Sequence, residues 1–189
     1  IWPDYWAIKE SVFPFNRFQG QDILLSPEMK STGEVMGLDA DLGTAYAKSQ
    51  MAANAPLPLE GKVFISVNKS DKSQIADLAK QFSDLGFELI CTEGTARVIQ
   101  EAGMEVREVR KLAEGRPNSL DLLKNGEIQL VINTPSGQAP RADEVKIRTT
   151  AVYSRVPIMT TLSSAKAAAS AIAALKKNGY QVKPIQEYH

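Results

Sequence analysis

Phe87-Glu88-Leu89-Ile90-Cys91-Thr92-Glu93-Gly94-Thr95-Ala96 is the stretch from which the fold can be inferred. Its apolar first half is typical of a buried strand, and its second half predicts a loop that starts a helix. Gly94 lets the backbone approach a ligand. In an open α/β sheet, anions bind where such a loop meets the N-terminus of a helix, because unpaired N–H groups point outward there. The stretch therefore predicts a phosphate or carboxylate site.

From Gly61 onward, apolar runs alternate with segments of helical period, which predicts an α/β fold: an open five-stranded parallel sheet with helices on both faces. Asp71 is expected to cap the first of these helices, and Cys91 to be an inert core residue. The expected strands are 62–67, 87–91, 106–109, 128–132 and 157–160; the expected helices are 72–85, 95–102, 118–125, 141–154 and 163–177, with a short closing segment near 182–185.

The composition favours a soluble cytoplasmic protein. Lys and Arg number 22, as do Asp and Glu, so the 189-residue chain has no overall basic field that would indicate nucleic acid or a membrane as partner. No apolar stretch approaches the roughly 20 residues of a membrane span, and no signal peptide is visible. The chain begins at Ile1 and its single histidine is His189, the last residue, so we expect an excised piece of a longer protein.

Residues 1–60 have a different character. They contain both tryptophans and lack the strand and helix alternation; a helical stretch, 41–53, and a proline-containing linker separate them from the α/β unit. About 40 such residues are too few for an independent core. We expect the edge of a domain whose remainder is absent, partly disordered or paired with a second copy through Phe13, Phe15 and Phe18.

Two segments carry a specific resemblance. Residues 9–18 (KESVFPFNRF) and 26–37 (SPEMKSTGEVMG) resemble the end of the second ATP-grasp half of the carbamoyl-phosphate synthase large chain. Residues 61–189 are similar to that family's C-terminal regulatory domain, which has a methylglyoxal-synthase-like fold. The matches are at 92–96, 114–117, 124–127, 132–134 and 160–162. The resemblance implies an ATP-grasp remnant at 1–40, a helix and linker at 41–60, and a methylglyoxal-synthase-like allosteric domain at 61–189.

The resemblance also implies an effector site. The family's regulatory domain binds nucleotide monophosphates, UMP or IMP, and the matching phosphate and ribose contacts fall on Lys72, Thr92, Thr95, Lys111, Asn133 and Thr134. Two ammonium groups and several donors from separate strand ends could converge on one dianion. Each residue also has a simpler interpretation, as a surface charge, a helix cap or a turn residue. Pro135 departs from the family pattern, because it replaces a threonine and removes a hydroxyl and an N–H.

A second effector, ornithine, is implied where the regulatory domain meets the catalytic half, with matching residues Glu10 and Thr160. The parent enzyme of this family makes carbamoyl phosphate from bicarbonate, glutamine nitrogen and two ATP, with Mg or Mn, for pyrimidine and arginine synthesis. Its expected partners are a glutaminase small chain and further copies of itself. For the fragment we expect no catalytic residue, no metal and no cofactor.

Two alternatives stay open. A methylglyoxal synthase shares the fold, but its reaction needs a carboxylate base and histidines, whereas this chain has only His189 and shows Glu114-Gly115-Arg116-Pro117-Asn118 in place of that enzyme's Gly-Gly-Asp segment. Asp121, the nearest carboxylate, is expected to face solvent. The second alternative is an oligomerisation module, which fits the aromatic N-terminal edge and the Ala-rich helix that begins near Ser163.

Overall fold

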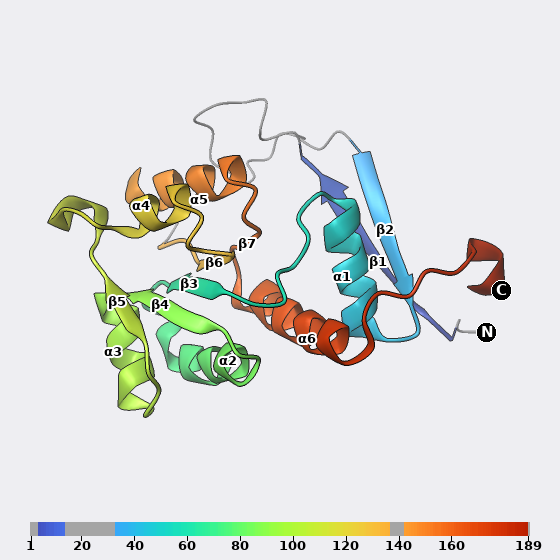
Figure 1. The fold of residues 1–189 in the computed structure, drawn as a ribbon, viewed down its shortest axis with the longest axis horizontal. Helices are drawn as coiled ribbons and strands as arrows, with labels where there is room; N and C mark the ends of the chain where they lie inside the picture. The colour runs from blue at the N-terminus through green and yellow to red at the C-terminus, as the bar shows by residue number, and fades with distance from the viewer. Residues whose placement is uncertain (1–3, 14–32, 137–141, 189) are drawn as a thin grey trace.

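The computed structural model describes residues 4–13, 33–136 and 142–188 (Figure 1). Its main unit is a five-stranded sheet in the order β5-β4-β3-β6-β7, in which every pair of neighbouring strands is parallel. The predicted open parallel sheet is therefore confirmed. The strands are β3 Lys62–Ser66, β4 Glu88–Thr92, β5 Arg107–Val109, β6 Leu130–Asn133 and β7 Ile158–Met159.

Helices cover both faces of this sheet, as predicted, and divide its core in two (Figure 1). Val63 and Ile65 of β3 pack on the side of α2, α3 and α6, whereas Phe64 packs on the side of α4 and α5. All three side chains are fully buried, as expected for a strand in the middle of a parallel sheet. The helices are α2 Lys72–Asp84, α3 Glu93–Glu101, α4 Ser119–Lys124, α5 Ala142–Tyr153 and α6 Leu162–Asn178.

The N-terminal part is an antiparallel pair, β1 Trp6–Val12 and β2 Gly33–Asp39, followed by α1 Leu42–Ala52. Gly37 lies so close to α1 that a Cβ there would overlap the Ala45 carbonyl oxygen. On the opposite side of α1, a Cβ on Gly43 would lie 3.0–3.3 Å from backbone and side-chain atoms of α6. The helix predicted at 41–53 therefore exists and packs between the β1–β2 pair and α6.

Asp71 does not cap α2 as predicted. It occupies the N-cap position in a right-handed helical conformation and makes no side-chain capping bond. Its carboxylate instead accepts a hydrogen bond from Asn68 Nδ2 at 2.8 Å, because that backbone conformation turns the side chain toward the preceding loop.

The segment after α6 also differs from expectation. Val182 is 92% exposed, and a short 3-10 helix, η3 Ile185–Tyr188, lies beside the β1–β2 pair (Figure 1). There the Tyr188 hydroxyl donates to the Leu38 carbonyl at 2.9 Å, and the Tyr188 ring packs edge-on against Tyr5 at 5.2 Å. Of the three phenylalanines expected to pair two copies, Phe15 and Phe18 lie outside the described residues. Among the helices of the described ranges, none is long and apolar enough to cross a membrane.

Candidate functional site

A pocket of about 410 Å³ lies at the carboxyl ends of the strands, where the connections after β3, β4, β5 and β6 meet. That size is within the usual range for a small-molecule site. Five of the six residues predicted to contact a nucleotide line it, and the sixth, Asn133, does not. The five are Lys72, Thr92, Thr95, Lys111 and Thr134.

Lys72 and Gly94 form the most pronounced feature of this pocket. A Cβ built on Gly94 would lie 2.6 Å from Lys72 Nζ, so the ammonium group occupies the space that a side chain at position 94 would need. Gly94 is in the first turn of α3, where backbone N–H groups point away from the helix. The first turn of α3 and the Lys72 ammonium thus present positive charge to the same space.

The three threonines connect the neighbouring loops. The Val67 backbone N–H donates to Thr95 Oγ1 at 3.4 Å, and the Asn68 N–H donates to Thr134 Oγ1 at 2.9 Å. The Thr92 hydroxyl lies 3.4 Å from Ser66 Oγ and makes no capping bond to α3. A hydroxyl that accepts a hydrogen bond still has its own proton to donate. Thr95 and Thr134 are therefore suited both to hold the β3–α2 connection and to bind an anion.

Lys111 lies at the exposed rim of the pocket. Its Nζ is 3.4 Å from Glu114 Oε1 and 3.5 Å from Glu93 Oε2. The hydrogen bond and charge of Glu114, together with the charge of Glu93, raise the pKa of Lys111. Its ammonium is charged at neutral pH but shared between two carboxylates, so an incoming anion has to compete for it.

Asn133 lies beneath the pocket and is 1% exposed. Its Oδ1 accepts from Arg148 Nη1 at 2.9 Å and its Nδ2 donates to the Ser66 carbonyl at 3.2 Å. Asn133, which was predicted to contact the nucleotide, thus supports the ends of β3 and β6 instead, because the buried guanidinium of Arg148 binds its amide oxygen.

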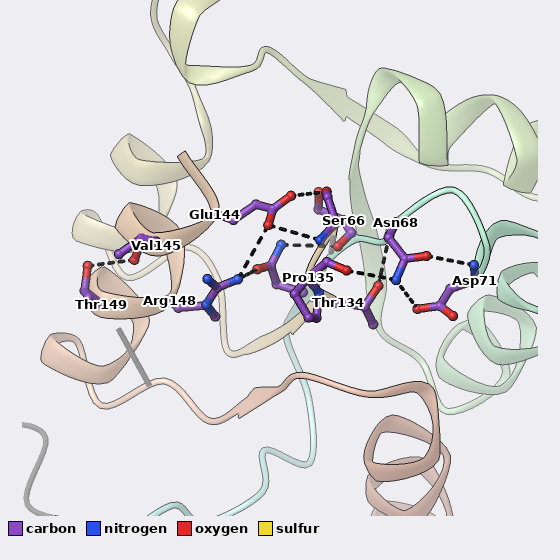
Figure 2. Close-up of polar contacts among 11 residues, drawn as sticks. Ser66, Asn68, Asp71, Thr134, Pro135, Glu144, Val145, Arg148 and Thr149 are labelled. Atoms are coloured by element: carbon purple, nitrogen blue, oxygen red, sulfur yellow. Dashed lines mark hydrogen bonds and ion pairs between the residues drawn. The ribbon is translucent and has the colours of Figure 1, made fainter. Parts of the chain in front are cut away.

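Sequence reasoning missed the polar network behind the pocket, which joins α5 to the loops after β3 and β6 (Figure 2). Arg148 is fully buried and Glu144 lines the pocket. Asn68 Nδ2 donates to the Pro135 carbonyl at 3.1 Å, so the residue that departs from the family pattern contributes to this network through its backbone. One signal was available: Arg148 is four residues after Glu144 and next to the apolar Ile147, on a helix expected to bury one face.

Asp121 is also more engaged than expected. Its Oδ2 accepts from the Asn118 backbone N–H at 3.0 Å, while Asn118 Oδ1 accepts from the N–H groups of Leu120 and Asp121 at 3.1 and 3.4 Å. Such a reciprocal capping box fixes the start of α4. The expectation of a purely solvent-facing carboxylate is therefore wrong.

Glu10 lies in a second region, at the junction of β1 and α1, and Thr160 follows β7. Glu10 accepts from Gln50 Nε2 at 2.8 Å, and partial burial raises the pKa of its carboxyl. Burial and the nearby charge of Glu10 raise the pKa of Tyr46 to about 12, and the Tyr46 hydroxyl is 3.7 Å from the sulfur of Met159, the residue before Thr160. Tyr46 thus links the surroundings of the two predicted residues.

Cys91 is fully buried in β4, and burial raises its thiol pKa to about 12. A thiol with such a pKa is protonated at neutral pH and is a poor nucleophile. The prediction of an inert core cysteine is confirmed.

Comparison with known proteins shows which proteins this chain is similar to. The family model described as "MGS-like domain" matches residues 74–160. The carbamoyl phosphate synthase large chain of Acidobacterium capsulatum is 50% identical over 98% of this chain and 17% of its own length. The arginine-specific, chloroplastic large chain of Oryza sativa subsp. japonica is 46% identical over 98% of this chain and 16% of its own length.

Among solved structures, a methylglyoxal synthase from Elizabethkingia anophelis NUHP1 is 18% identical and has a TM-score of 0.47, covering 58% of this chain and 77% of that chain. The present chain spans less than a fifth of the length of the curated relatives cited above. Residues 74–160 thus match the MGS-like domain model, and the chain is similar over nearly its whole length to the C-terminal part of carbamoyl phosphate synthase large chains.

Proposed function

We propose that this chain is the effector-binding region of a glutamine-hydrolysing carbamoyl phosphate synthase large chain, and that its pocket binds the phosphate of a nucleotide such as UMP or IMP. The observation that carries the proposal is the position of Lys72 Nζ above Gly94 in the first turn of α3. Thr92, Thr95 and Thr134 line the same pocket and supply further donors. This combination of an ammonium group, helix N–H groups and hydroxyls is suited to a phosphate dianion.

The charges of the pocket favour a nucleotide over a simple anion. Its lining contains three cations, Lys72, Arg97 and Lys111, and three carboxylates, Glu93, Asp143 and Glu144. Such a balanced lining does not attract anions in general. A ligand with a phosphate at one end and donor groups at the other satisfies both signs, because carboxylates such as Glu93 and Asp143 accept hydrogen bonds from ribose hydroxyls and base N–H groups. We therefore expect the sugar and base to contribute to affinity.

We further propose that Glu10 binds the ammonium group of an amino acid effector, ornithine, near Thr160. Support comes from the half-buried Glu10 carboxyl, whose pKa is raised by that burial. A carboxylate that burial has partly deprived of water gains from a cationic partner. In the proposed parent, residues of the ATP-grasp half would complete this site.

In the proposed parent, the effectors would act through their different affinities for two arrangements of the interface between this region and the ATP-grasp half. That parent would make carbamoyl phosphate in the cytoplasm from bicarbonate, glutamine nitrogen and two ATP with Mg or Mn. It would work with a glutaminase small chain and associate with further copies through this region. The products would serve pyrimidine and arginine synthesis.

Calorimetric titration of the 189-residue chain with UMP, IMP, uridine and ornithine tests the proposal. We expect UMP or IMP to bind and uridine, which lacks the phosphate, to bind far more weakly. Lys72→Gln should weaken UMP binding by about 1.5–3 kcal/mol, the usual value for a hydrogen bond to a charged group. Lys80→Gln, on the exposed side of the same helix where Lys80 pairs with Asp84, is the matched control and should change nothing.

Equal binding of UMP and uridine, or an unaltered affinity in Lys72→Gln, would exclude the assigned phosphate position. Incubation with dihydroxyacetone phosphate tests the alternative enzyme. Release of methylglyoxal by the chain would replace the effector-binding function with a lyase.

A further inference from the structure

One carboxylate already occupies part of the pocket. Glu144, in the first turn of α5, lines the pocket with only 13% of its side chain exposed. Its Oε1 accepts a hydrogen bond from the Ser136 hydroxyl, and its Oε2 accepts from the Ser136 backbone N–H at 3.3 Å. Two donors of one residue thus converge on the two oxygens of one carboxylate.

A buried cation stands behind this carboxylate. Arg148 is fully buried, and its Nη1 is 2.9 Å from Asn133 Oδ1 and 3.9 Å from Glu144 Oε2. The longer distance is an ion pair without a direct hydrogen bond. Glu144 is therefore attracted to Arg148 by charge and held in place mainly by Ser136.

A hydroxyl, a backbone N–H and a nearby guanidinium are also the groups that bind phosphate or carboxylate ligands. We infer that Glu144 is an internal anion: in the ligand-free protein it occupies the donors of Ser136, and an anionic group of a ligand entering the pocket has to displace it from them. The inference rests on the proposed function and adds to it a residue of this chain that sets affinity and selectivity. Weak anions are excluded because they do not compete well enough with a tethered carboxylate.

Removal of the charge provides the test. Glu144→Gln keeps the size of the side chain and a carbonyl oxygen for the Ser136 hydroxyl, but it no longer repels an anion. We expect binding of inorganic phosphate and of UMP to tighten by about five- to fiftyfold, the effect of one unit charge at short range in a partly buried site. Increased affinity is not the result that disturbed packing would produce, so the readout separates competition from a structural role.

The matched control is Glu105→Gln. Glu105 is exposed and precedes β5, at the amino end of the strand, whereas the pocket lies at the carboxyl ends. Glu105→Gln changes the net charge by the same amount as Glu144→Gln. Once salt screens distant charges, Glu105→Gln should leave the affinities for phosphate and UMP within a factor of about two of the native values. An equal gain in Glu105→Gln and Glu144→Gln would overturn the inference, because net charge alone would then explain the result.

A double-mutant cycle identifies the contested donor. In Ser136→Ala the hydroxyl is absent for Glu144 and for the ligand alike. If the two compete for it, Glu144→Gln should give a smaller gain in the Ser136→Ala background than in the native one. An undiminished gain would contradict competition at Ser136.

The same titrations separate this inference from the proposed function. Unchanged affinity in Glu144→Gln, with UMP binding to the native chain, would reject the internal anion and leave the nucleotide site standing. Phosphate binding that appears only in Glu144→Gln, with no UMP binding to the native chain, would support the internal anion and argue against UMP as ligand. If neither phosphate nor UMP bound to either protein, both proposals would fall.

Discussion

At the scale of single residues, Gly94 shows how a missing side chain creates a site. It lies inside a helix, where glycine is usually unfavourable by about 1 kcal/mol relative to alanine. The space above its Cα is occupied by Lys72 Nζ, 2.6 Å from the position of a Cβ. The glycine therefore allows a close approach between an ammonium group and the first turn of α3.

Gly94→Ala should consequently separate stability from binding. We expect the melting temperature to be unchanged or slightly raised, because alanine favours the helix, and UMP affinity to fall about tenfold as the ammonium is pushed aside. Calorimetry and thermal melts measure the two effects. Gly33→Ala, where an added Cβ meets nothing within 4 Å, is the control. Unaltered UMP affinity in Gly94→Ala would contradict the role given to Lys72.

Glu10 predicts a pH dependence of stability. Burial raises the pKa of Glu10 in the folded state above the ordinary value of 4.5, which applies to the unfolded state. At a pH between these two pKa values, the folded state binds a proton that the unfolded state has released. The free energy of unfolding therefore falls as pH rises across this window, and it stays lowered above it. Glu10→Gln lacks this loss and should melt higher than the native chain at pH 7.

Melting curves from pH 3 to 8 would measure this difference. The advantage of Glu10→Gln should vanish below about pH 4, where the native carboxyl is protonated in both states. Glu34→Gln, in the neighbouring strand, removes an exposed carboxylate that pairs with Lys9 and is the control. A constant difference between Glu10→Gln and the native chain at every pH would refute the assignment to Glu10 ionisation.

At the scale of elements, two helix starts contrast in how they are fixed. Asp71 stands at the N-cap of α2 without making a capping bond, whereas Asn118 caps α4 with two accepted hydrogen bonds. Asn118 is only 6% exposed, and its Nδ2 also donates to the Gly115 carbonyl at 3.0 Å. It thereby joins α4 to the loop that precedes it, which contributes Lys111 and Leu112 to the pocket.

Asn118→Ala should lower the free energy of unfolding by about 1–2 kcal/mol, as expected for the loss of an N-cap. Urea denaturation followed by circular dichroism measures this change. Asn125→Ala is the control, because Asn125 ends the same helix and its exposed side chain makes only a 3.5 Å contact with Glu127. Equal losses in the two variants would show that the cap has no special role.

At the scale of the whole molecule, the segment after α6 meets the N-terminal strand pair. The 3-10 helix at Ile185–Tyr188 returns to the β1–β2 pair after α6 has crossed beneath α1 (Figure 1). The Tyr188 hydroxyl binds the Leu38 carbonyl, and Lys183 Nζ lies 4.1 Å from the centre of the Tyr188 ring. The C-terminal segment thus stabilises a strand pair that is otherwise covered mainly by α1.

Tyr188→Phe should therefore loosen one part of the molecule selectively. It removes the hydrogen bond to Leu38 and keeps the ring contacts, so amide hydrogen exchange should become faster in residues 33–39 and stay unchanged in β4. Exchange measured by mass spectrometry on peptides of both strands tests this. Tyr153→Phe, on the exposed side of α5, is the control. Faster exchange throughout the sheet would indicate global destabilisation instead.

Much of the fold was predictable because it depends on local patterns. The apolar runs and turn residues of 61–178 indicated the parallel sheet, and chain order placed the ends of β3, β4 and β6 at one edge. Five of the six nucleotide residues line the pocket for that reason. The contacts of Asp71, expected to cap α2, and of Asp121, expected to face solvent, were predicted less well, because both depend on the conformation of the loops before the helices.

The sequence by itself determined the order of strands and helices and the edge at which threonines and lysines gather, because periodicity and chain connection are local properties. Only the tertiary structure decided that Arg148 is buried, that Asn133 supports the pocket from below, and that Glu144 occupies the Ser136 donors. These roles arise when the buried face of α5 meets the end of β6. Whether a polar side chain binds a ligand or a neighbouring residue depends on which donors and acceptors the packing of the helices and strands brings within hydrogen-bond distance.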